Sequence, residues 1–277
     1  MSDPRTLAEL QRAVVACERC PRLRAWCTKV AEVRKRAFAD QEYWGKPVPA
    51  YGDPRARLLI VGLAPAAHGG NRTGRIFTGD SSGNWLYAAL HKVGLSNQPD
   101  STGLKDGLKL TDTYVTAAAH CAPPQNKPTR QELDACQPWL ESEIRLLPTV
   151  RVVVALGRVG WERWLRAAGW WSKLSVRERP PFGHGRETRM PDGTLLITSY
   201  HPSRQNTHTG RLTRPMWEGI FRRARAILDQ EGDGDGRAVA KARAQAHAQA
   251  QAPARRPLEP RPPEPRARAR SRKEARA

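Results

Sequence analysis

Four short apolar segments constrain the fold of this chain more than any other feature of its sequence. Each is a continuous run rich in β-branched or other apolar residues, without the polar–apolar alternation of a strand that has one face in water. Such runs are typical of parallel strands that are covered by helices on both faces. The four segments are Arg57–Pro65, Thr113–Ala119, Val150–Leu156 and Thr194–His201.

Helical patterns separate these runs and complete an α/β arrangement. One of them opens with Thr129-Arg-Gln-Glu132, a capping box, and another has Pro215 well placed for its first turn. Alternating strands and helices predict a three-layer α/β/α domain around a parallel sheet, whose ligands bind beyond the carboxyl ends of the strands. The predicted helices are Asn84–Val93, Thr129–Leu147, Arg158–Ala168 and Arg214–Gln230.

The charge of the chain indicates a polyanionic partner. Its 277 residues include 47 Lys and Arg against 27 Asp and Glu, a net charge of +20. Residues 231–277 contain 12 basic and 6 acidic side chains, which leaves +14 on residues 1–230. Because residues 1–230, the predicted folded domain, are themselves basic, we expect them to bind nucleic acid. Residues 231–277 are rich in Ala, Arg, Pro and Gln, and we expect a disordered basic tail because they have too little apolar surface to fold.

The sequence predicts neither a membrane span nor a secretory signal. No apolar run approaches the ~20 residues that a bilayer requires. The first residues are polar and charged, unlike the apolar segment of a signal peptide. We therefore expect no membrane partner and a reducing, cytoplasmic location of the bacterial, nucleoid-associated type, in which cysteines are free or bind metals.

Four of the five cysteines occur in pairs. Cys17 and Cys20 form a C-x2-C pair, and Cys121 and Cys136 follow about a hundred residues later. Four thiolates complete a zinc site or an iron–sulfur cluster, and this spacing does not separate the two. Cys27 fits neither pair and is expected to be a buried small side chain. The plainer alternative is that all five are ordinary core cysteines.

The loop after the first predicted strand, residues 62–80, contains candidate binding groups. Its Gly69-x4-Gly74 spacing is a near miss to the phosphate-binding loop, but the lysine and hydroxyl that reach phosphate and magnesium are missing. Phe77 and Asp80 at the end of the loop are a candidate stacking platform and a candidate carboxylate. The alternatives are a ring that closes the core and an aspartate that caps the next helix.

Two further loops follow predicted strands. His201 stands at the carboxyl end of the fourth run, well placed as a hydrogen-bond donor or general acid. Asn126 lies in the loop after the second run, and its amide offers the acceptor and donors needed to read a base edge. Asn126 could instead brace the Pro-rich turn around it.

These loops resemble motifs of the family 5, or type B, uracil-DNA glycosylases. The resemblance rests on residues 62–80, 121–129 and 201–213 and on the paired cysteines, and it extends over about Cys17 to Leu228. It implies a four-stranded parallel sheet and a [4Fe-4S] cluster on the four paired cysteines. It also implies hydrolysis of the N-glycosidic bond of uracil and other deaminated bases, such as hypoxanthine, in double-stranded DNA.

The resemblance also implies roles for individual residues. A catalytic or base-reading role is implied for Asp80, Asn126 and His201. The base would stack on Phe77, in a pocket that Gly62 and Ala67 help to line. The loop that begins at His201, residues 201–213, is called the histidine-led loop below. It would enter the duplex at the place vacated by the extruded base. Its predicted DNA-binding residues are Ser203, Arg204, Gln205, Asn206 and Arg211.

The residues just after the first strand affect the expected chemistry. Other superfamily members place Asp, Asn or Glu there to position water, whereas residues 64–67 are Ala-Pro-Ala-Ala, so only Asp80 remains for that role. Small side chains there should also admit purines. No lysine is positioned for a Schiff base, so we predict a monomeric, monofunctional glycosylase that leaves an abasic site for downstream base excision repair enzymes. The alternatives are a family 4-like, uracil-specific glycosylase and a non-catalytic, metal-containing DNA-binding module.

Overall fold

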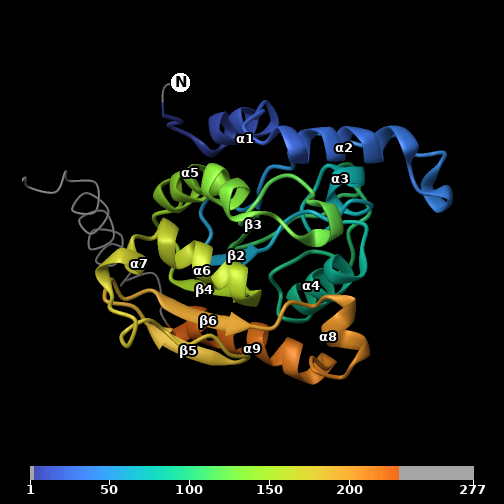
Figure 1. Ribbon diagram of the computed structural model, residues 1–277. Helices are drawn as coiled ribbons and strands as arrows, with labels where there is room; N and C mark the ends of the chain where they lie inside the picture. The colour runs from blue at the N-terminus through green and yellow to red at the C-terminus, as the bar shows by residue number, and fades with distance from the viewer. Residues whose placement is uncertain (1–2, 231–277) are drawn as a thin grey trace, which may run out of the picture.

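The computed structural model describes residues 3–230. Within this range the strands form one mixed sheet of six strands, in the order β1-β3-β2-β4-β6-β5 (Figure 1). Its four central strands are parallel to one another and lie within the four predicted apolar runs. They are β2 (Leu58–Gly62), β3 (Thr113–Ala117), β4 (Val152–Leu156) and β6 (Leu195–Ser199).

The sheet is larger than the four-stranded parallel sheet that the resemblance implied. β1 (Tyr51–Gly52) pairs antiparallel with β3 at one edge, and β5 (Arg186–Arg189) pairs antiparallel with β6 at the other. Neither edge strand has an apolar run. β5 reads Arg-Glu-Thr-Arg and is mostly exposed, as is common for charged edge strands that discourage pairing with another chain.

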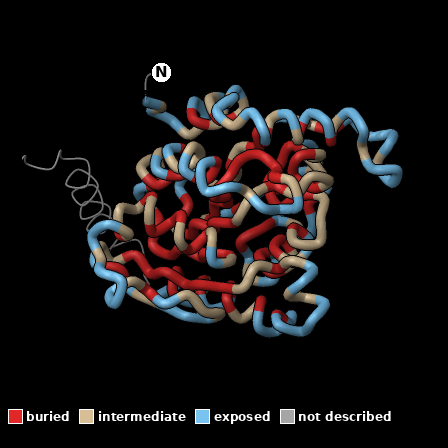
Figure 2. The backbone as a smooth tube through the Cα atoms, viewed as in Figure 1, coloured by how far each residue is buried: buried red, intermediate tan, exposed pale blue. Residues whose placement is uncertain are grey.

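Helices cover both faces of the sheet, so the predicted three-layer α/β/α architecture is confirmed. Along β2, Leu58 and Ile60 pack on the layer that contains α4 and α9, whereas Leu59 and Val61 pack on the layer that contains α5 and α6. This alternation is the two-residue period of a strand, and every residue of β2 is buried. Figure 2 shows the buried strands at the centre of the domain. The covering helices are α4 (Ser81–Lys92), α5 (Arg130–Leu146), α6 (Gly157–Ala167) and α9 (Arg214–Gln230).

Two N-terminal helices follow one another along one side of the domain, at the top of the view in Figure 1. α1 (Leu7–Val15) contacts α5, and α2 (Pro21–Val33) contacts α3. The predicted capping box is present at the start of α5, where Thr129 and Glu132 cap each other's backbone. The remaining short elements are η1 (Arg36–Phe38), α3 (Gly70–Thr73), η2 (Pro124–Asn126), α7 (Trp170–Lys173) and α8 (Arg204–His208).

The order of the strands determines where a ligand can bind. The chain passes from β2 to β3 on one side and then returns past β2 to β4 on the other. The carboxyl ends of β2 and β4 therefore flank the topological switch point, where open α/β sheets bind ligands. Within residues 3–230 no helix is both long and apolar enough to cross a membrane. The predicted tail, residues 231–277, lies outside the described residues, so the domain boundary stays a prediction.

Candidate active site and cysteine pocket

Phe77 is held against the carboxyl end of β2. A Cβ on Gly62 would lie 2.7 Å from two ring carbons of Phe77, so only glycine permits this approach. Phe77 itself has a left-handed backbone, with φ 53°, a conformation that few aromatic residues adopt. Its ring is 7% exposed and belongs to the core on the α4 and α9 side. Phe77 therefore closes the core, as the alternative prediction stated, and its ring also reaches the switch point.

His201 meets Phe77 from the end of β6. The two rings are stacked, with centroids 5.8 Å apart and an interplanar angle of 25°. The Asn206 side-chain amide donates to the His201 carbonyl oxygen at 2.9 Å. Burial lowers the pKa of His201 to about 4, so the imidazole is neutral near pH 7. Among the described residues, no hydrogen bond engages either of its ring nitrogens. A neutral ring of this kind can donate a hydrogen bond from one nitrogen.

Asp80 lies at the start of α4, close to the same end of the sheet. Its Oδ1 accepts the Gly83 N–H at 2.9 Å, so the predicted helix-capping role is present. Its Oδ2 points toward Gly69, where a Cβ would lie 2.5 Å away. Burial raises the pKa of Asp80, while the Gly83 and Ser82 amides, Arg204 and Arg72 oppose the shift. Capping uses only part of the carboxylate, which retains acceptor capacity for a ligand.

Arg72 braces the loop that carries Phe77 and Asp80. Its Nε donates to the His68 carbonyl oxygen at 2.9 Å, and its Nη2 donates to the Gly79 carbonyl oxygen at 3.1 Å. Its guanidinium also lies 4.0 Å from the centre of the Phe38 ring. A Cβ on Gly79 would lie 2.4 Å from Arg72 Nη2. Arg72 thus connects the two ends of the loop, a role that the sequence prediction missed although the Gly-Asn-Arg-Thr-Gly string contains it.

Asn126 and Ala67 lie in other surroundings within the described structure. Asn126 ends η2 on an exposed turn with φ 57°, and no hydrogen bond within residues 3–230 joins its amide to Phe77 or His201. Ala67 packs against the small cluster around Cys121, on the cysteine side of the loop. The structure therefore brings Gly62, Phe77, Asp80 and His201 together but leaves these two residues at the margin.

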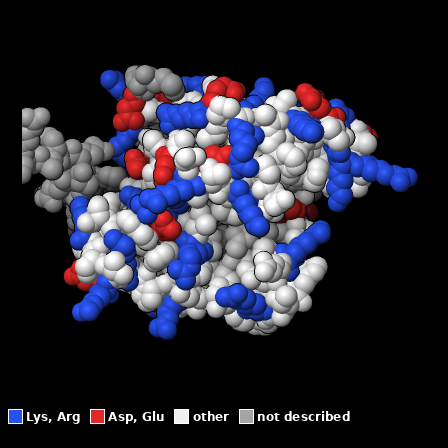
Figure 3. Space-filling model, viewed as in Figure 1, with Lys and Arg blue, Asp and Glu red and all other residues white. Residues whose placement is uncertain are grey.

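The histidine-led loop is tied to the start of α4, where Ser82 Oγ donates to the Pro202 carbonyl oxygen at 3.1 Å. Ser203 precedes α8, and Arg204 and Gln205 are exposed in its first turn. Asn206 differs, because its amide nitrogen is used to hold His201. Arg211 is exposed and lies 4.6 Å from the centre of the Tyr200 ring. Lys and Arg side chains border a hollow between α6 and α8 (Figure 3).

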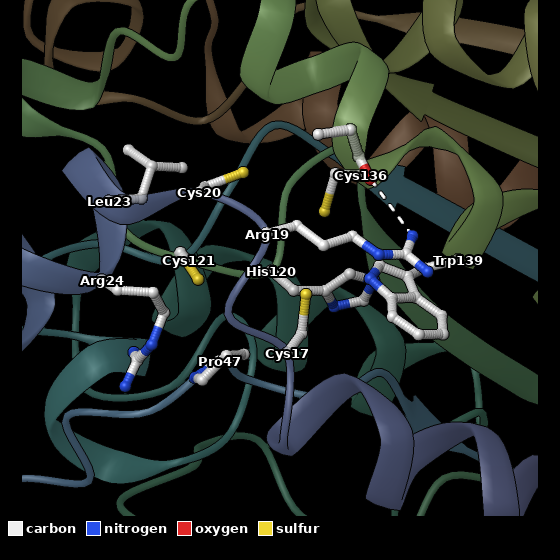
Figure 4. A pocket seen from close by; sticks show the side chains of 11 residues that line it. Cys17, Arg19, Cys20, Leu23, Arg24, Pro47, His120, Cys121, Cys136 and Trp139 are labelled. Carbon is white, nitrogen blue, oxygen red and sulfur yellow. Dashed lines mark hydrogen bonds between the residues drawn. The ribbon is translucent and has the colours of Figure 1, made fainter. Parts of the chain in front are cut away.

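The four paired cysteines surround one pocket (Figure 4). Cys17 follows α1, Cys20 precedes α2, Cys121 follows β3 and Cys136 lies in α5. Arg19 lies beside the pocket, where it donates to the Ala135 carbonyl oxygen at 3.4 Å and covers the Trp139 ring. The two cysteine pairs, far apart in the sequence, therefore line the same pocket.

The thiols of this pocket influence one another electrostatically. Burial, together with the neighbouring Cys17 and Cys20, raises the pKa of Cys136 to about 12. Burial, followed by Cys17, likewise raises the pKa of Cys20. Thiols bind metal ions in their deprotonated form, so a bound cation would oppose the raised pKa values of Cys20 and Cys136. Cys27 is fully buried and donates to the Ala122 carbonyl oxygen at 3.5 Å, in agreement with its predicted role.

Comparison with known proteins decides the family. The model of the uracil DNA glycosylase superfamily matches residues 49–225, which include the first-strand loop and the histidine-led loop. A type-5 uracil-DNA glycosylase of Mycobacterium tuberculosis is 51% identical over 223 residues, which are 80% of this chain and 82% of that protein. The chain belongs to the uracil-DNA glycosylase superfamily. The predicted enzyme class is thereby confirmed.

Two further relatives show which type of uracil-DNA glycosylase this chain resembles more. The type-5 uracil-DNA glycosylase of Thermus thermophilus is 51% identical over 216 residues, 78% of this chain and 95% of that protein. A type-4 uracil-DNA glycosylase of Pyrobaculum aerophilum is 28% identical over 222 residues, 80% of this chain and 92% of that protein. This glycosylase is therefore more similar to the type-5 relatives than to the type-4 relative.

The glycosylase departs from a phosphate-binding loop in one further respect. Arg75, which follows Gly74 in the near-miss motif, is buried and pairs with Asp106 at 2.7 Å. It also donates to the Ser101 hydroxyl at 2.9 Å. This pair fastens the loop to the segment before β3, so the Arg75 guanidinium is occupied within the protein.

Proposed function

We propose that this chain is a type-5 uracil-DNA glycosylase that removes uracil and other deaminated bases, such as hypoxanthine, from double-stranded DNA. The stacked rings of Phe77 and His201 at the switch point carry the proposal. A flat ring at a strand end offers a surface for an extruded base, and extrusion costs roughly a few kcal/mol, least at a mismatch. The position of Asp80 beside this surface supports hydrolysis rather than binding alone.

The reaction breaks the bond between C1′ of the sugar and the base nitrogen, and the bonding electron pair leaves with the base. His201, neutral near pH 7, would donate a hydrogen bond to the base oxygen as negative charge develops there. That interaction is stronger in the transition state than in the substrate, which is the condition for accelerating the reaction.

Asp80 would act on the sugar side of the bond. As a carboxylate it would stabilise the positive charge on the sugar and orient the water that adds to C1′, with the water proton passing to the carboxylate or to the departing base. Residues 64–67 lack a carboxylate or amide that could share this role. Without a Schiff-base lysine, the product is an abasic site in an uncut strand.

The substrate range follows from the size of the groups around the base. The small residues 64–67 leave room for purines, which supports hypoxanthine as a second substrate. The exposed amide of Asn126 would read the base edge once DNA is bound, because its turn is at the surface. We also propose that the enzyme acts as a cytoplasmic monomer and that downstream repair enzymes take up the abasic site.

We also propose a [4Fe-4S] cluster on Cys17, Cys20, Cys121 and Cys136. A zinc ion needs four sulfurs at about 2.3 Å from one centre. Within residues 3–230, no three Cys, His, Asp or Glu side chains are grouped to hold a metal ion, although these cysteines share one pocket. Four Cys thiolates are the usual ligand set of a [4Fe-4S] cluster. When bound, the cluster would ionise the thiols and fasten the N-terminal helices to β3 and α5.

A panel of duplexes with one lesion each tests the proposed activity. Each duplex contains uracil, hypoxanthine, xanthine or an undamaged base, and the products are separated before and after alkali. We expect cleavage at uracil and hypoxanthine only after alkali. Strand cutting without alkali would contradict the monofunctional mechanism, and intact strands after alkali would leave a DNA-binding module.

A further inference from the structure

Two arginines lie over aromatic rings next to the loops of the candidate active site. The Arg158 guanidinium lies 5.5 Å from the centre of the Phe182 ring, and the Arg211 guanidinium lies 4.6 Å from the centre of the Tyr200 ring. The two rings also contact each other, with centroids 6.4 Å apart. We call these four residues, Arg158, Phe182, Tyr200 and Arg211, the arginine–aromatic track.

The arginine–aromatic track adjoins the candidate active site. Tyr200 directly precedes His201, and Arg158 follows Gly157, where a Cβ would lie 3.5 Å from His201 Cβ. The segment after Phe182 is fixed at the carboxyl end of β6, because the Gly183 and Gly185 amides donate to Thr198 at 3.3 and 2.8 Å. The track therefore lies at the same edge of the sheet as the site.

The two arginines of the track are available to an anion. Arg158 and Arg211 are exposed, and neither has a carboxylate within 4 Å in the part of the chain that the structure describes. By contrast, Arg163 and Arg223 lie away from the track and pair with acidic side chains at 2.5 and 2.8 Å. Exposed arginines without acidic partners, on a basic domain, match the charge of a DNA backbone.

The aromatic rings give these arginines a defined orientation. A guanidinium over a ring gains cation–π attraction of about 0.5–1 kcal/mol at an exposed site. Its flat face is then occupied, which leaves the N–H groups on its edge able to bind a phosphate. An arginine held in this way loses less side-chain entropy on binding than a free one. The rings of Phe182 and Tyr200 thus hold the side chains of Arg158 and Arg211 in position before an anion binds.

We propose that the arginine–aromatic track binds the DNA backbone beside the extruded base. Arg158 and Arg211 each neutralise one phosphate, and Phe182 and Tyr200 position the two guanidinium groups. This extends the DNA contact beyond the histidine-led loop to the start of α6 and the segment before β5. The inference rests on the DNA substrate of the family and not on the roles of Asp80 and His201.

Salt dependence of binding provides the test. Affinity for a duplex with a non-cleavable tetrahydrofuran abasic site is measured across a potassium chloride series for the parent, Arg158→Gln, Arg211→Gln and Arg55→Gln. Each lost phosphate contact should make the fall of log K with log salt shallower by about 0.9. At 0.1 M salt this corresponds to an affinity about eightfold lower. Arg55 is an exposed control at the amino end of β2.

A shallower salt dependence for Arg158→Gln and Arg211→Gln, with the parental dependence for Arg55→Gln, supports DNA binding by the track. Parental slopes for both track variants overturn it, and so does an equal fall for Arg55→Gln, since net charge alone would then set affinity. Phe182→Leu keeps both charges and should lower affinity with a smaller change in slope. Thermal unfolding of each variant checks that it is folded before binding is compared.

Discussion

The imidazole ring of His201 stacks on the phenyl ring of Phe77, with centroids 5.8 Å apart and planes 25° from parallel. One ring comes from the loop after β2 and the other from the end of β6, so the fold alone brings them together. The pair combines an apolar surface for a base with a hydrogen-bond donor for its oxygen. This combination is the centre of the proposed mechanism.

Replacing Phe77 with Leu should weaken the capture of the extruded base. Stacking of a base on an aromatic ring contributes about 1–3 kcal/mol, so we expect kcat/KM for a uracil duplex to fall about 5- to 150-fold. The variant keeps an apolar side chain in the core, and single-turnover kinetics measures the effect. A parental kcat/KM in folded Phe77→Leu would show that the base does not stack there.

Gly62→Ala tests the same surface while both rings remain. The new methyl group would lie 2.7 Å from the Phe77 ring, so the ring must move away from the end of β2. We expect a loss of kcat/KM at least as large as that of Phe77→Leu. Full activity would mean that the position of the ring is unimportant.

His201 should make the protein less stable in acid. Burial lowers its pKa to about 4, so between about pH 6.5 and pH 4 the unfolded chain binds a proton that the folded chain does not. The free energy of unfolding therefore decreases as the pH is lowered through this window, by at most about 1.4 kcal/mol per pH unit for one proton. Denaturant unfolding of the parent and His201→Gln should show a shallower decline for the variant. Equal declines would contradict a buried neutral imidazole.

Arg72 should influence the ionisation of Asp80. Arg72 and Arg204 are the cations that oppose the raised pKa of this carboxyl group, together with the Ser82 and Gly83 amides. Removing the charge in Arg72→Gln should raise the pKa further, so the acid limb of the single-turnover pH–rate profile should move to higher pH.

The control for this prediction is Arg36→Gln, which removes an exposed charge from η1, on the segment that contacts Arg72. We expect the acid limb of Arg36→Gln to coincide with that of the parent. A limb that stays in place for Arg72→Gln would show that Arg72 braces the loop without acting on the charge of Asp80.

The cysteine pocket predicts a clear difference between the cysteines. Alanine at any of the four positions that line it should remove iron and visible absorbance and lower the melting temperature, because the N-terminal helices lose their attachment. Cys27→Ala should keep the iron and the visible absorbance, since Cys27 does not line the pocket. Metal analysis and absorbance spectra of purified protein decide the matter. A colourless, folded parent with one zinc ion would contradict the cluster.

The sequence predicted the buried strands well because their apolar runs depend on burial alone. It did not predict β1 or β5, since short edge strands such as Arg186–Arg189 contain no apolar run. The candidate site residues Phe77, Asp80 and His201 were chosen from their places after predicted strands, and the structure stacks Phe77 on His201. The contacts of Arg72 were missed, because hydrogen bonds to the His68 and Gly79 carbonyl oxygens depend on the folded loop and leave no pattern in the sequence.

The rate of uracil release by the parent and by Asp80→Asn tests the central claim most directly. Asparagine also caps helices, so the variant should keep α4 and bind the duplex. Under single-turnover conditions we expect the parent to release one uracil per duplex, and Asp80→Asn to do so roughly 10²–10⁴-fold more slowly. A parental rate in folded Asp80→Asn, or no uracil release by the parent, would contradict the proposed active site.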